Sequence, residues 1–254
     1  MDDRLLRRRL LIGAAVAAAC FVVLWPLQTS GAMKPLNNWV EGGIQNHLER
    51  ETTTTYYCSN HTCKTNPDPR MTWAYTTPRN GTFNDTAYGH RSILPWNGVP
   101  SQLGEGSAAT AVMMASVVLL LFVGARRSAL VGGALALLGG ALVNPLKYEI
   151  AWTGRPPYPS GHTAGATLAW GFLLVFAMLA LRRMGLVRVP LRWMLIAWSV
   201  VAFAVGFDRL TTHAHVLSDV LLGWSFAAAV VLFAAWLDAT LAARADASEQ
   251  AKAP

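Results

Sequence analysis

Two short segments, residues 147–162 and 208–219, each bring several charged and titratable side chains close to long apolar runs. Each segment contains a histidine, His162 in the first and His215 in the second, and an imidazole can gain or lose a proton near neutral pH. Asp219 follows His215 by four residues, so the two side chains share a face if that stretch is helical. A carboxylate placed there can hold an imidazole in one tautomer and stabilise its cation.

Cations gather in the same two segments. Lys147, Arg155 and Arg209 supply three positive charges, and such donors suit a tetrahedral dianion such as phosphate. Ser160 and Gly161 directly precede an apolar run, where the free backbone N–H groups of a helix N-terminus would add donors. A nucleophile, an acid for the leaving oxygen and an anion clamp are the parts that phosphoryl transfer through a covalent intermediate requires.

The composition predicts that these segments are held by a membrane protein. Of the 254 residues, 53% are hydrophobic and only 14% are charged, whereas a soluble domain carries about a quarter charged residues. The apolar residues are also blocked into long runs separated by short basic clusters, as in polytopic membrane proteins. These clusters account for much of the net charge of +7, so no nucleic-acid partner is indicated.

Six apolar segments are predicted to span the membrane, at about residues 10–27, 107–125, 128–145, 163–181, 193–207 and 216–237. The basic clusters between them, from Arg4 to Lys252, fall on one side, which the positive-inside rule makes cytoplasmic. Residues 28–106, 146–162 and 208–215 then face outward, so both chemical segments lie on the extracytoplasmic side. We therefore predict an all-α bundle of six transmembrane helices in the plasma (inner) membrane, with both termini cytoplasmic.

The first apolar run has a second interpretation. It follows an arginine-rich start and precedes Ser30-Gly31-Ala32, which resembles the cleavage site of a signal peptide. The run is long enough to span a bilayer, and this length favours an uncleaved anchor.

Residues 28–106 contain no spanning segment and are predicted to form a small extracytoplasmic loop domain. A short helix lying on the membrane surface is indicated by five apolar residues on one helical face: Leu36, Trp39, Val40, Ile44 and Leu48. Strands are favoured by the β-branched and aromatic residues of Thr52–Tyr57 and Met71–Thr77. A disulfide between Cys58 and Cys63 is a candidate if the loop faces an oxidising compartment.

The predicted divisions of the chain are the cytoplasmic N-terminus and first helix (1–27), the loop domain (28–106), a five-helix catalytic membrane core (107–237) and a cytoplasmic tail (238–254).

The two chemical segments resemble the signature of the type 2 phosphatidic acid phosphatase family, which reads K-x6-R-P, P-S-G-H and S-R-x5-H-x3-D. Pro159-Ser160-Gly161-His162 matches the second motif in full, and Arg209, His215 and Asp219 match the third in identity and spacing. The resemblance implies that His215 is the nucleophile, His162 the general acid and Asp219 the residue that orients His215. It implies phosphoryl-oxygen contacts from Lys147, Arg155, Ser160, Gly161 and Arg209. It also implies a metal-independent enzyme without a cofactor.

The sequence departs from this signature at three places. Seven residues instead of six separate Lys147 from Arg155, and the first two motifs nearly abut. Asp208 stands where the third motif has serine. This carboxylate either pairs with Arg209 and weakens the anion clamp, or points away from it. The resemblance covers roughly residues 107–237.

The function implied by this resemblance is hydrolysis of a lipid-linked phosphate or pyrophosphate of the polyprenyl, phosphatidate or phosphatidylglycerol phosphate class, through a phosphohistidine intermediate. The partners expected are the lipid phosphate substrate and membrane lipids, and no particular oligomeric state is indicated. Two alternatives stay open. One is a phosphotransferase that passes the phosphoryl group to a lipid or sugar, and the other is a non-catalytic envelope protein that binds anionic lipid.

Overall fold

The computed structural model describes residues 3–59, 62–64, 71–72, 83–92, 98–148, 159–212 and 214–252, with side chains for 3–44, 47–48, 98–143, 159–212 and 214–252. Its α-helices are α1 (Asp3–Thr29), α2 (Lys34–Leu48), α3 (Gly106–Phe122), α4 (Arg126–Tyr148), α5 (Gly161–Gly171), α6 (Met178–Arg183), α7 (Leu191–Thr211) and α8 (Leu217–Gln250). A 3-10 helix, η1 (Pro100–Gly104), precedes α3, and a π-helical turn, η3 (Phe172–Ala177), joins α5 to α6.

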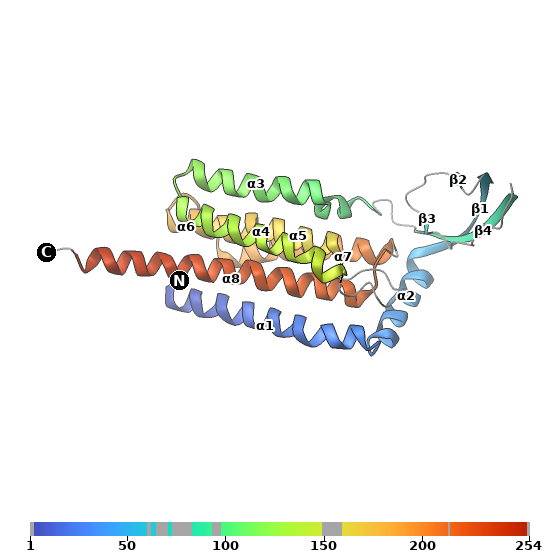
Figure 1. Cartoon of the computed structure of the whole chain (residues 1–254), viewed down its shortest axis with the longest axis horizontal. Helices are drawn as coiled ribbons and strands as arrows, with labels where there is room; N and C mark the ends of the chain where they lie inside the picture. Colours follow the sequence, from blue (N-terminus) through green and yellow to red (C-terminus); the bar gives the residue numbers. More distant parts are fainter. Residues whose placement is uncertain are drawn as a thin grey trace.

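The helices form a bundle along the long axis of the molecule (Figure 1). Five helical segments are long and apolar enough to cross a membrane: α1, α4, the continuous α5–α6 segment, α7 and α8. The helix α3 is apolar but has only 17 residues. The multi-pass helical architecture is therefore confirmed, while the predicted count of six spans stays a prediction.

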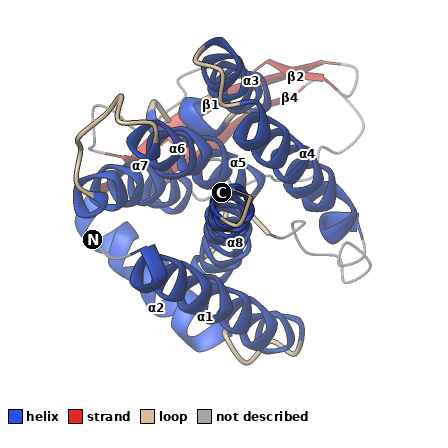
Figure 2. Cartoon of the chain, turned by 90° about the vertical axis from the view of Figure 1, so that its left-hand side faces the viewer, coloured by secondary structure: helices blue, strands red, loops and turns tan. Residues whose placement is uncertain are grey.

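The α5–α6 segment lies at the centre of the bundle. In an 18-residue apolar stretch of this segment, 72% of the residues are buried inside the bundle, compared with 11% of those in such a stretch of α1. Phe172, Val175 and Phe176 are at most 2% exposed and pack in one cluster with Ala227 and Val231 of α8. Seen from the end that carries the chain termini, α8 lies between α1 and the rest of the bundle (Figure 2).

The two ends of the bundle differ in what they carry. Both termini and the links α3–α4 and α6–α7 lie at one end, which we call the terminal end (Figure 1). The helix α2, the strands and the link α7–α8 lie at the other, which we call the site end (Figure 1). Because α8 continues to Gln250, most of the segment predicted as a tail from residue 238 is helical.

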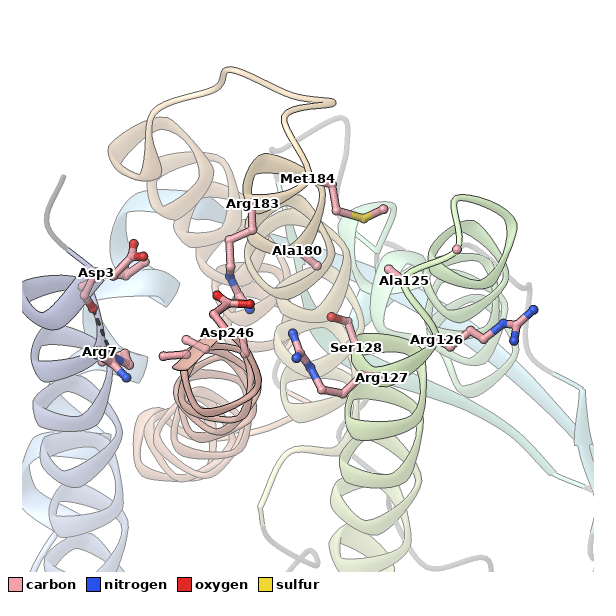
Figure 3. Close-up of a pocket in the computed structure, with 15 residues that line it drawn as sticks. Asp3, Arg7, Ala125, Arg126, Arg127, Ser128, Ala180, Arg183, Met184 and Asp246 are labelled. Carbon is pink, nitrogen blue, oxygen red and sulfur yellow. Dashed lines mark hydrogen bonds between the residues drawn. The ribbon is translucent and has the colours of Figure 1, made fainter. Parts of the chain in front are cut away.

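A fully buried carboxylate ties three helices together at the terminal end. Asp238 of α8 accepts hydrogen bonds from Ser128 Oγ at 3.0 Å, Arg127 Nε at 3.4 Å and Arg183 Nη1 at 2.6 Å. Beside these residues lies a cavity of about 460 Å³. Its charged lining residues are shown in Figure 3: Asp3, Arg7, Arg126, Arg127, Arg183 and Asp246.

The helix predicted between residues 36 and 48 is confirmed as α2. It crosses the site end at a steep angle to α1 (Figure 1). Val40, Ile44 and Leu48 pack with apolar residues of α7 and α8. Trp39 is 76% exposed, so only part of the predicted apolar face docks on the bundle.

Four antiparallel strands follow α2: β1 (Glu49–Ser59), β2 (Thr62–Lys64), β3 (Met71–Thr72) and β4 (Phe83–Ser92), in the sheet order β2-β1-β4-β3. The strand predicted at Thr52–Tyr57 lies inside β1. Of Met71–Thr77, the structure describes only β3. Cys58 and Cys63 are partners in the register of β1 and β2, but their side chains lie outside the described residues. The disulfide and the separate loop domain therefore stay predictions.

Candidate active site

The beginning of α8 holds the predicted histidine–carboxylate pair. Val216 is the N-cap of α8, so His215 and Asp219 stand one turn apart across the helix start. His215 Nδ1 lies 3.3 Å from Asp219 Oδ2, and the two side chains are 11% and 3% exposed. Because Nδ1 faces the carboxylate, Nε2 is the ring nitrogen left to act on a substrate. The same Oδ2 accepts the Val216 N–H at 3.4 Å, which satisfies one of the free donors at the helix N-terminus.

The α1–α2 region reaches the same helix start with two buried amides. Gln28, near the end of α1, donates from Nε2 to Asp219 Oδ1 at 2.9 Å. Asn37 of α2 donates to Ser218 Oγ at 2.8 Å, and its Oδ1 accepts the Ser218 N–H at 3.1 Å. Sequence reasoning missed both residues, because a single amide near an apolar run matches no spacing pattern.

Ser160 joins the second motif to the third. It is the N-cap of α5 and is fully buried, and its Oγ accepts the Thr163 N–H at 3.4 Å and the Thr163 hydroxyl at 2.9 Å. Its own backbone N–H donates to the carbonyl of Asp219 at 3.1 Å. A Cβ on Gly223 would stand 3.1 Å from the Ser160 carbonyl oxygen, so a glycine lets α8 approach this closely.

His162 lies in the first turn of α5, between η1 and an apolar groove. Gly104 of η1 packs directly against the carbonyl of His162, and a Cβ at Gly104 would clash with that carbonyl. On another side is a groove of about 670 Å³ between α3, α4 and α5. The groove is lined mainly by apolar side chains, among them Met113, Leu137 and Leu168, and it also includes His162.

Asp208 is turned toward η1. It is 2% exposed, and its two oxygens accept the N–H of Gly98 at 2.6 Å, the N–H of Ser101 at 3.1 Å and the Ser101 hydroxyl. The sequence left open whether this carboxylate pairs with Arg209 or points away from the clamp. The contacts show an anchor for residues 98–101, a role that no motif indicates.

Arg209 lies next to His215 in space, at the end of α7. Its carbonyl accepts the His215 N–H at 3.2 Å, and its Nη1 donates weakly to Ser101 Oγ at 3.5 Å. Its Nε is buried and has no hydrogen-bond partner within the described part of the chain. A buried donor without a partner is costly, and an anionic ligand beside it would remove that cost.

A series of hydrogen bonds therefore brings four predicted site residues together: Ser160, Asp219, His215 and Arg209. Gly161 and His162 directly follow Ser160. Lys147 lies in the last turn of α4, but its side chain, like all of Arg155, lies outside the described residues. Within the described part of the chain, no three histidine, cysteine or acidic side chains group as metal ligands. The metal-independent mechanism stays a prediction.

Comparisons with known proteins give a family match for this region and a shared fold for the chain. A PAP2 superfamily model matches residues 143–242, a range that contains all eight predicted catalytic and phosphate-binding residues. The fold matches a solved structure described as the first transmembrane PAP2 type phosphatidylglycerolphosphate phosphatase from Bacillus subtilis, with a TM-score of 0.57. The match has 16% sequence identity and covers 90% of this chain and 97% of that one. No curated protein matches the sequence. The family match over residues 143–242, the shared fold and the apolar helices support a multi-pass membrane protein similar to the type 2 phosphatidic acid phosphatase (PAP2) family.

Proposed function

We propose that this membrane lipid phosphatase hydrolyses a lipid-linked phosphate or pyrophosphate through a phosphohistidine on His215. The observation that carries the proposal is the contact of His215 with the buried Asp219, beside Arg209. The Nε of Arg209 has no hydrogen-bond partner within the described residues. The pair supplies an oriented nucleophile, and the guanidinium supplies a donor for phosphoryl oxygens.

In the first step, the lone pair of His215 Nε2 forms a bond to phosphorus while the bond from phosphorus to the leaving oxygen breaks. His162 gives its proton to that oxygen, and Asp219 stabilises the cationic imidazole. In the second step, His162 takes a proton from a water molecule whose oxygen attacks phosphorus. The N–P bond then breaks, which releases phosphate and regenerates both histidines.

Arg209 binds phosphoryl oxygens during both steps, together with Lys147, Arg155, Ser160 and Gly161. Negative charge grows on these oxygens in the transition state, so donors fixed around them lower the barrier. The N-terminus of α5 contributes its backbone donors at the same place.

The apolar groove supports a lipid substrate. It runs between α3, α4 and α5 and includes His162, so an apolar chain lying in it would place its head group beside the catalytic residues. The substrate classes that fit are polyprenyl phosphates, phosphatidate and phosphatidylglycerol phosphate. The arginines of the terminal end favour a cytoplasmic location for that end, which supports a site on the extracytoplasmic side of the plasma (inner) membrane.

The test is phosphate release from a panel of these lipids by the detergent-purified protein in EDTA. We expect release by the wild type and a loss of about 10³-fold or more in His215→Ala, since the nucleophile is removed. His47→Ala, which changes an exposed histidine of α2, is the matched control and should keep wild-type activity. Retained activity in His215→Ala would overturn the mechanism, and transfer of labelled phosphate to an added lipid or sugar would indicate a phosphotransferase.

A further inference from the structure

The carboxylate of Asp219 is held on both of its oxygens. Oδ2 faces His215 Nδ1 and the Val216 N–H, while Oδ1 accepts the hydrogen bond from Gln28 Nε2 at 2.9 Å. Gln28 is 4% exposed, so water does not readily replace this donor. The contact between Oδ2 and Nδ1 is long, at 3.3 Å, and a rotation of the carboxylate about its last bond would lengthen it further.

We propose that Gln28 is a positioning residue for phosphoryl transfer, which acts by fixing the carboxylate of Asp219 so that Oδ2 stays aimed at His215. This inference rests on the proposed function. It adds a residue from α1, outside the matched family range of residues 143–242, to the machinery built by α5, α7 and α8.

The position of Gln28 is itself fixed by packing. One turn before it, Leu24 and Trp25 pack with Phe21 against the fully buried Leu222 of α8. The ring of Phe21 also lies 5.6 Å from that of Phe226, centroid to centroid. Such aromatic contacts hold α1 in register with α8, so the amide reaches the carboxylate from a rigid support.

The chemistry of an amide suits this role better than a cation does. The nitrogen of Gln28 donates a hydrogen bond without cancelling the negative charge of Asp219. That charge is needed in the transition state, because it stabilises the imidazole of His215 as it becomes cationic. A cationic side chain at residue 28 would compete with the imidazole for the same carboxylate.

Asn37 provides a matched comparison on the same helix start. It is also a buried amide from the α1–α2 region, but its hydrogen bonds among the described residues go to Ser218 and not to the carboxylate of Asp219. If the amides only dock α1 and α2 on α8, removing either one should have the same effect. If Gln28 acts through Asp219, the two effects on catalysis should differ.

The experiment compares Gln28→Met and Asn37→Leu in the detergent-purified full chain, because each replaces an amide by an apolar side chain of similar size. We expect Gln28→Met to lower kcat by about 10- to 100-fold with KM changed less than about threefold, as for other residues that support a catalytic group. Asn37→Leu should lower the Tm at least as much but change kcat by less than about threefold. Gln28→Lys should also lower kcat, although lysine restores a donor.

A double variant separates positioning from any other effect. In the background of Asp219→Ala, the further change Gln28→Met should cause no additional loss of kcat, measured with an aryl phosphate whose good leaving group keeps the rates measurable. Three outcomes overturn the inference: kcat of Gln28→Met within about threefold of wild type, an equal loss in Asn37→Leu, or an additive loss in the double variant. An active His215→Ala would instead overturn the proposed function, so the two failures are distinguishable.

Discussion

The helix α8 carries two buried carboxylates, one at each end of the bundle, and their partners differ in charge. At the terminal end, Asp238 meets two guanidinium groups and a hydroxyl. At the site end, Asp219 meets an amide, a backbone N–H and the imidazole of His215. The first carboxylate is neutralised by fixed cations, so it joins helices. The second is held by neutral donors, so its charge remains available to an imidazole that becomes cationic during catalysis.

The largest effect that this comparison predicts is on catalysis at the site end. Asp219→Asn keeps the shape of the side chain but removes its charge, so we expect kcat to fall by about 10³- to 10⁴-fold, as in other histidine–carboxylate pairs. The Tm should fall only modestly, because the amide oxygen can still accept from Gln28 although the amide nitrogen cannot accept the Val216 N–H. Phosphate release and thermal unfolding of the same preparation measure the two quantities, and near-normal kcat would contradict the assigned role.

The opposite result is expected at the terminal end. Asp238→Asn leaves the guanidinium groups of Arg127 and Arg183 without a counter-charge, so we expect a loss of about 2–4 kcal/mol in the free energy of unfolding. Since this residue lies far from the site, kcat per folded molecule should stay close to wild type. Denaturant titration in detergent measures the free energy of unfolding, and phosphate release by the same preparation measures kcat. A loss of kcat at unchanged stability would show that the two carboxylates do not differ in role.

The sequence predicted the parts of this comparison that depend on local patterns. Blocked apolar runs indicated the membrane helices, and the spacing of His215 and Asp219 placed them one turn apart at the start of a helix. The partners of the carboxylates were not predictable in this way. Gln28 is 191 residues from Asp219 in the chain, and Ser128 is 110 residues from Asp238. Such contacts depend on how helices pack, and neither hydrophobic periodicity nor a motif encodes them.

Asp208 shows the same limit within a motif. Its position next to Arg209 suggested an effect on the anion clamp, whereas both of its oxygens bind residues 98–101. The sequence of η1 contains no signal for this contact. The substitution of aspartate for the family's serine is explained only when the two segments are seen together.

A third prediction concerns packing at the site end, where η1 packs closely against the first turn of α5. Gly104→Ala would press a methyl group against the carbonyl of His162, so we expect kcat to fall by about tenfold with a modest loss of stability. Gly106→Ala is the matched control, since its Cβ would meet nothing within 4 Å. Kinetics of both variants under the same conditions decide the matter, and equal activity would show that the position of His162 does not depend on η1.

The smallest effect is expected from the weaker partner of Asp238. Arg183 binds the carboxylate at 2.6 Å with a side chain that is 24% exposed, whereas Arg127 binds at 3.4 Å and is 44% exposed. Water screens the more exposed pair, so Arg127→Gln should cost less than about 1 kcal/mol in the free energy of unfolding. Arg183→Gln should cost more, because it removes the shorter bond and leaves a buried carboxylate with a weaker counter-charge. Denaturant titration of both variants gives the order. If Arg127→Gln were the more damaging, Asp238 would depend on long-range charge and not on the short bond to Arg183.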